Sequence, residues 1–201
     1  MDATELKNLL QRLKGELESG QPVAPELKAL LQDLDRDIQQ AIAKIGELIT
    51  LRRFSVEKAG AGEQIETYSH MGGKIGVIVK IAFQGEANDK AGLTSLVKDL
   101  AMQIAATSPI SIDPKDVPPA TVEKEREIAR ELTIKEGKIG DMLERIVEGK
   151  LNKFFKENCL LQQIFVKDNK TQIDKLLATS AKTLGVENLR VVSFHRLQLG
   201  Q

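Results

Sequence analysis

The side chains that could carry out chemistry in this chain are few and far apart in sequence. Two histidines, His70 and His195, and one cysteine, Cys159, occur among 201 residues. No Cys, Ser or carboxylate accompanies either histidine in the manner of a nucleophile and its base, so both are expected to be surface or hydrogen-bonded core residues, with a functional role more open for His70. The sequence therefore predicts neither an enzyme nor a cofactor site.

The single cysteine limits both redox chemistry and metal binding. Cys159 excludes an intrachain disulfide and a multi-cysteine zinc site, and it fits a reducing compartment. We expect it to behave as a small, partly buried apolar residue, with an intermolecular disulfide as the alternative. No metal site is predicted.

Two other patterns resemble chemical sites at first sight. Gly72, Gly73 and Gly76 lack the spacing of a phosphate-binding loop and the helix that should follow it. The acidic residues between 123 and 136 alternate with Lys and Arg, which is typical of a solvated helix face with charge pairs four residues apart. Both patterns are interpreted as structural, so the chain is not expected to hydrolyse nucleotides.

Composition narrows the class of partner. Lys plus Arg and Asp plus Glu are equal at 29 each, so no basic excess draws the chain to nucleic acid or anionic lipid. With one Tyr, six Phe and no Trp, it also lacks the aromatic residues that stack on bases. No secretory signal and no run of roughly 20 apolar residues is present. We expect a cytoplasmic protein that binds another protein, without direct contact to nucleic acid or membrane.

Two amphipathic helices are expected at the N-terminus. Leucines recur at three-to-four-residue spacing over residues 6–17. Pro25 suits the first turn of a second helix, whose apolar spacing continues to a glycine stop at Gly46.

Three short strands are expected next, as an antiparallel meander. Alternation at Ile49, Leu51 and Val56 predicts the first, and residues 64–69 and 75–83 predict the other two. His70, Met71, Gly72 and Gly73 connect the last two strands, since glycine supplies the positive φ of a tight hairpin. An amphipathic helix, from Leu93 to Ile104, is predicted after them.

Prolines between 109 and 119 mark the clearest boundary in the chain. Beyond them a charged helix over residues 121–136, a reversal at Gly137 and Gly140, and a return helix predict a projecting antiparallel helical hairpin, or short coiled coil. Its apolar support is expected from Val122, Ile128, Ala129, Leu132 and Ile134 facing Ile139, Met142, Leu143, Ile146 and Val147.

The C-terminal part should return to the core. An apolar group is expected to be buried there: Leu160, Leu161, Ile164 and Phe165. A helix over residues 171–184 ends at Gly185, and a strand over residues 189–199 should pair with the meander. The fold class is therefore α+β, with a three-stranded antiparallel sheet packed with helices plus the hairpin.

We expect four regions along the chain. Residues 1–46 form N-terminal helices, 47–117 the core sheet and helix, 118–158 the hairpin insertion, and 159–201 the return to the core with the last helix and strand.

Four stretches resemble the elongation factor Ts family. They are IQQAIAKIGELITLRRF at 38–54, YSHMGGKIGVIV at 68–79, VKDLAMQIAATSP at 97–109, and the series from 118 to 167 that contains VEKEREIA, ERIVEGKLNKFF and CLLQQIFVK. The resemblance covers residues 30–199. It implies an α+β module with a helical hairpin that binds elongation factor Tu and promotes GDP release. Some members carry two such modules, and others carry one that dimerises.

Two features of the family pattern are missing. No T-G-A-G-M-like stretch, which marks the family's N-terminal three-helix domain, occurs before Ile38. The T-D-F-V motif that disturbs the nucleotide site is replaced by the sequence FQGEAN at 83–88. The alternative is therefore a divergent or partial module that binds elongation factor Tu, or itself, without exchange activity.

The resemblance also implies where a partner binds. The module is similar to the half of a two-module factor that contacts domain 3 of elongation factor Tu. Its expected interface positions are Tyr68, His70, Met71 and Gly73, on the hairpin between two strands. A homodimer is the second expected assembly.

Overall fold

The computed structural model describes residues 25–200, with side chains from residue 32 onward. The helix expected over residues 6–17 lies outside the described residues. The chain divides into two compact units at Phe54 and Ser55, and each is considered separately.

The described part of the first unit is a helix followed by an irregular segment. Helix α2 (Pro25–Ile45) ends at Gly46, which has φ 78° and donates its N–H to the Ile42 carbonyl at 2.9 Å. This confirms the second predicted helix and its glycine stop.

The strand predicted from Ile49 to Val56 is wrong, because residues 47–60 belong to no strand. The alternation there suggested that Val56 faces a core. Instead Val56 is 54% exposed, and its neighbour Glu57 turns toward the sheet. Both residues belong to the second unit. A charged residue thus holds this segment in place of an apolar one.

The second unit is built on a three-stranded antiparallel sheet in the order β1-β2-β3. Its strands are β1 (Glu63–His70), β2 (Ile75–Gln84) and β3 (Glu187–Gln198). Tyr68 pairs with Val77, and Val77 pairs with Arg196, so the central strand joins its sequence neighbour to the C-terminal strand. The α+β fold class, the β-hairpin of β1 and β2, and the pairing of the C-terminal strand with this sheet are confirmed.

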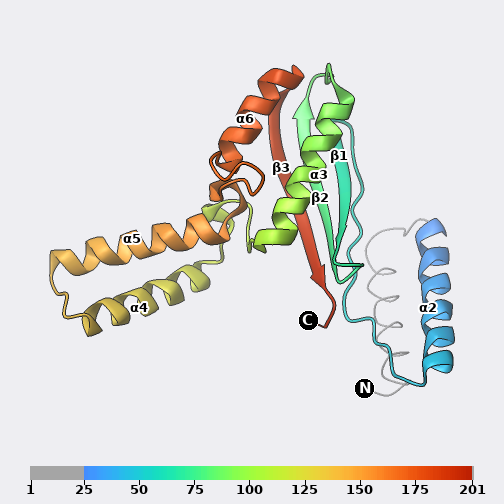
Figure 1. Ribbon diagram of the computed structural model, residues 1–201, viewed down its shortest axis with the longest axis horizontal. Helices are drawn as coiled ribbons and strands as arrows, with labels where there is room; N and C mark the ends of the chain where they lie inside the picture. Colours follow the sequence, from blue (N-terminus) through green and yellow to red (C-terminus); the bar gives the residue numbers. More distant parts are fainter. Residues whose placement is uncertain (1–24, 201) are drawn as a thin grey trace. The chain divides into compact units, whose positions relative to one another are not determined.

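The core lies on one face of this sheet. Alternate β2 residues Val77, Val79 and Ile81 are buried there because side chains along a strand point to opposite faces. Helices α3 (Lys90–Thr107) and α6 (Ile173–Leu184) pack on this face (Figure 1). Leu100 and Ile104 of α3 are fully buried in the same cluster.

Two further helices form a hairpin that extends away from the sheet (Figure 1). They are α4 (Pro119–Lys135) and α5 (Asp141–Asn158). Gly137 and Gly140 have φ values of 77° and 63°, which supports the predicted reversal. Two ion pairs join the helices: Arg130 Nη2 lies 2.9 Å from Glu144 Oε1, and Arg126 pairs with Glu148.

The apolar stripes predicted for this hairpin are only partly right. Its buried residues are Ala129, Val147 and Leu151, with Thr133 fully buried. The small side chains of Ala129 and Thr133 take the buried positions of α4. The larger residues of the predicted stripes are exposed: Ile128 (42% exposed), Leu132 (48%), Ile134 (50%), Ile139 (79%) and Met142 (57%).

The segment after α5 is held by a buried amide. Gln103 of α3 is fully buried; its Oε1 accepts the Val166 N–H at 2.8 Å, and its Nε2 donates to the Ile164 carbonyl and to Gln163 Oε1, each at 3.2 Å. Leu160 and Phe165 are buried as predicted, but Ile164 is 48% exposed. The polar amide of Gln103 fills the space beside this backbone, so the side chain of Ile164 turns outward.

Cys159 is buried, so its thiol is not accessible to a second molecule in the folded protein, which argues against the intermolecular disulfide. The side chain is 0% exposed, Ser111 Oγ donates to Sγ at 3.3 Å, and burial raises the pKa of the thiol. We expect a thiol reagent such as Ellman's reagent to react slowly with the native protein and fully in denaturant. Fast stoichiometric labelling of the native protein would contradict this burial.

Candidate functional site at the β-hairpin and the open sheet face

The turn between β1 and β2 has a left-handed backbone over three successive residues. Met71, Gly72 and Gly73 all have positive φ, at 52°, 66° and 92°. A positive φ is strained for a residue with a side chain, such as Met71. The Met71 side chain is 62% exposed. The turn therefore displays a large apolar side chain to solvent.

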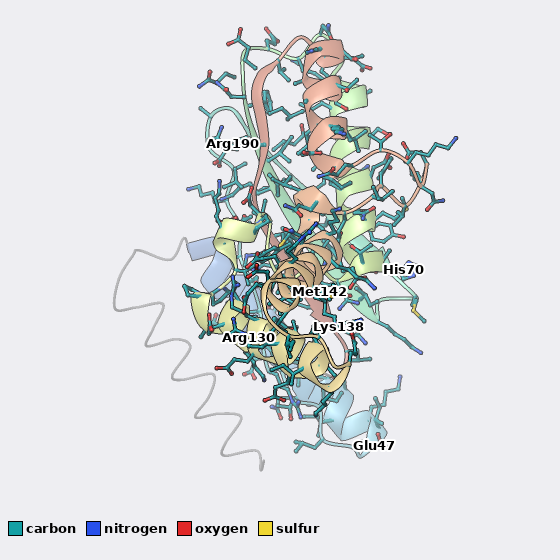
Figure 2. All side chains as sticks on the ribbon, turned by 90° about the vertical axis from the view of Figure 1, so that its left-hand side faces the viewer. Glu47, His70, Arg130, Lys138, Met142 and Arg190 are labelled. Carbon is teal, nitrogen blue, oxygen red and sulfur yellow. The ribbon has the colours of Figure 1, made fainter. Side chains whose placement is uncertain are left out.

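Two ring side chains stiffen the strand that leads into this turn. The Tyr68 hydroxyl lies 3.1 Å from His70 Nδ1, and the rings stack with centroids 5.8 Å apart and an interplanar angle of 25°. Tyr68 also packs against the core, whereas His70 is exposed near the end of β1 (Figure 2). The structure thus brings the four predicted interface residues together, since Gly73 belongs to the same turn. Whether they bind a partner stays a prediction.

The face of the sheet opposite α3 carries a shallow hollow of ≈ 280 Å³. Gly76 is among the residues that line it, and a Cβ there would meet no atom within 4 Å. Apolar and small polar residues form the rest of the lining, among them Thr67, Ser69, Ile78, His195 and Leu197. We call this surface the open face.

A carboxylate that sequence reasoning missed lies on the open face. Glu57 Oε2 is 2.8 Å from Lys80 Nζ, while Oε1 accepts from Ser193 Oγ at 2.8 Å and lies 2.9 Å from His195 Nε2. These contacts, the bond to Lys80 first, lower the pKa of Glu57 to about 2. No local pattern could reveal this cluster, because Glu57 and His195 are 138 residues apart in sequence.

The loop after β2 has ordinary structural contacts. Asp89 caps α3 by accepting the Gly92 N–H at 2.8 Å, and exposed Glu86 pairs with Lys90 at 3.1 Å. These acidic groups support the start of α3. Within residues 25–200, no cluster of three His, Cys, Asp or Glu side chains could hold a metal ion, and none of the described helices is long and apolar enough to span a membrane.

The fold and these surfaces define an α+β module with a projecting helical hairpin and an exposed β-turn. Comparison with known proteins identifies the family. The family described as "Elongation factor TS" matches residues 9–201, and the chain belongs to that family.

Individual relatives agree with this assignment. The chain is 39% identical over 202 residues to "Elongation factor Ts" of a Nitratiruptor species, covering 97% of this chain and 65% of that protein. It is 40% identical over 179 residues to "Elongation factor Ts" of Clostridium botulinum (strain Loch Maree), covering 89% and 55%. The chain thus spans 55% to 65% of the length of these relatives.

Proposed function

We propose that this protein binds elongation factor Tu in the cytoplasm and promotes the release of GDP from it. The observation that carries this proposal is the family match over residues 9–201. Exchange of this kind needs no covalent chemistry. The protein must bind the nucleotide-free state of its partner more tightly than the GDP state, so that each ligand weakens the binding of the other by the same factor.

The surface proposed for this contact is the turn with Tyr68, His70, Met71 and Gly73. Its support is physical: Met71 projects from the turn and is 62% exposed. Burial of a large apolar side chain against a partner would remove its surface from water and favour binding.

The rate of GDP release decides whether exchange occurs. Elongation factor Tu loaded with a fluorescent GDP analogue is mixed with micromolar protein, and release is expected to accelerate. The loop sequence FQGEAN at 83–88, in place of an acidic-aromatic pair, favours the alternative of binding without exchange. Binding measured by titration with an unchanged release rate would establish that alternative, and absence of binding to elongation factor Tu would refute exchange and leave only self-association.

The proposed interface yields a prediction with a matched control. Met71→Ala is expected to weaken binding to elongation factor Tu about tenfold, since it truncates an exposed anchor. Met142→Ala removes a methionine of similar exposure, 57% against 62%, from the helical hairpin and should leave affinity unchanged. Equal effects of the two changes in a calorimetric titration would refute the assignment of the turn.

Self-association is proposed as a second assembly. The open face has an apolar hollow, which supports pairing between copies of the chain. Sedimentation equilibrium tests it: a mass that rises toward twice 22.2 kDa supports a dimer, and a constant mass at high concentration refutes it.

A further inference from the structure

Residues 55–59 lie on the open face in an unusual orientation. Val56 points to solvent, 54% exposed, whereas Glu57 points to the sheet with only 13% of its side chain exposed. A segment that packs on a sheet normally turns its apolar residues inward. Here the inward contact is a carboxylate, so charge and hydrogen bonds hold the segment.

The contact is well satisfied chemically. Lys80, beneath Glu57 on β2, is 16% exposed, and both carboxylate oxygens have partners on β2 or β3. The titratable groups that face Glu57 are Lys80 on β2 and His195 on β3, and Glu63 on β1 acts on Lys80. Such a pair is costly to break on one side only, because the partner charge remains where it is poorly hydrated.

A fixed turn adjoins the segment. Gly60 donates its N–H to Glu63 Oε2 at 2.8 Å, and the Glu63 N–H donates back to the Gly60 carbonyl at 3.2 Å. The Phe83 N–H then bonds the Gly62 carbonyl at 2.8 Å, which ties this turn to β2. Release of Glu57 would therefore free residues 55–59 and leave β1 in register.

We propose that residues 55–59 form a releasable strap, which Glu57 fastens across the open face and whose opening uncovers Lys80 and the centre of that face. The strap is closed while Glu57 is ionised. It opens when that carboxylate is neutralised or replaced, and the sheet beneath stays folded.

The pH dependence has a definite sign. The pKa of Glu57 falls from 4.5 to about 2 on folding, so closure is complete above pH 4.5 and is lost as the pH falls toward 2. Hydrogen exchange of the strap amides, corrected for the intrinsic effect of pH, should rise relative to that of β2 across this window. The rise should be absent in Glu57→Gln.

Proteolysis at neutral pH provides the sharpest test. Lys58 lies within the strap, so cleavage after Lys58 by the lysine-specific protease Lys-C reports the open population. Glu57→Gln should speed this cleavage about tenfold, which corresponds to ~1.4 kcal/mol of opening. Lys138, in the turn of the helical hairpin, provides an internal reference whose cleavage rate should not change. Glu86→Gln removes an exposed glutamate paired with Lys90 and is the matched control.

The outcomes separate a strap from an ordinary structural contact. Faster cleavage at Lys58 alone, with unchanged exchange of the β2 amides, supports the proposal. An unchanged rate at Lys58 overturns it. Acceleration at Lys58 and Lys138 together, with faster exchange in β2, also overturns it, because Glu57 would then stabilise the whole unit.

Discussion

Leu100→Ala is expected to lower the free energy of unfolding by about 2–5 kcal/mol, one of the two largest effects predicted for this chain. Leu100 is fully buried in α3 and belongs to the same cluster as Val79 and Ile81 of β2. The change removes apolar contacts and leaves a cavity that neighbouring side chains fill only in part. Urea unfolding followed by circular dichroism measures the difference.

A leucine on a solvent-facing helix is the matched control. Leu132 of α4 is 48% exposed, so Leu132→Ala should cost less than about 1 kcal/mol. Comparable losses for the two variants would show that the core does not lie between α3 and the sheet.

Gln103→Leu is expected to cost about 2–4 kcal/mol, although leucine has nearly the same volume and is apolar. The substitution leaves the Val166 N–H and the Ile164 carbonyl without their buried partner. Each stranded group loses its hydration without gaining a hydrogen bond. The segment after α5 should therefore loosen first, with faster hydrogen exchange at Val166.

A double-mutant cycle isolates this network. Thr107→Val removes a hydroxyl that bonds Gln163 Oε1 at 2.7 Å, an atom that Gln103 also contacts at 3.2 Å. The double variant should differ from the sum of the single variants by at least about 0.5 kcal/mol, because both partners bond one atom. An additive result, or a neutral Gln103→Leu, would mean that water replaces the lost contacts.

Regular elements were predictable where local pattern and packing agree. The spacing of apolar residues placed α3, and Gly185 ends α6 with φ 68°, a conformation that glycine adopts without strain. The strand expected at Ile49 was wrong. Alternating apolar and polar residues indicate that one side of a segment is covered, but they do not say which part of the protein covers it. The stripe through Ile134 was only partly right, because the buried positions of α4 hold the small Ala129 and Thr133, whereas Leu132 and Ile134 are exposed.

The candidate site divides in the same way. The turn at Met71 and Gly73 could be found from sequence, because its glycines and its resemblance to the family are local. The Glu57 cluster could not be found, since Lys80, Ser193 and His195 meet the carboxylate only after the sheet has formed.

The order of strands in the sheet has a consequence for how the protein is made. β2 lies between β1 and β3, and β3 begins only at Glu187, more than 100 residues after β2 ends at Gln84. During synthesis the β1–β2 hairpin can form early, but one edge of β2 stays bare until β3 leaves the ribosome. During that interval this apolar strand is a site at which a nascent chain can pair wrongly, and a chaperone that shields strand edges would act then.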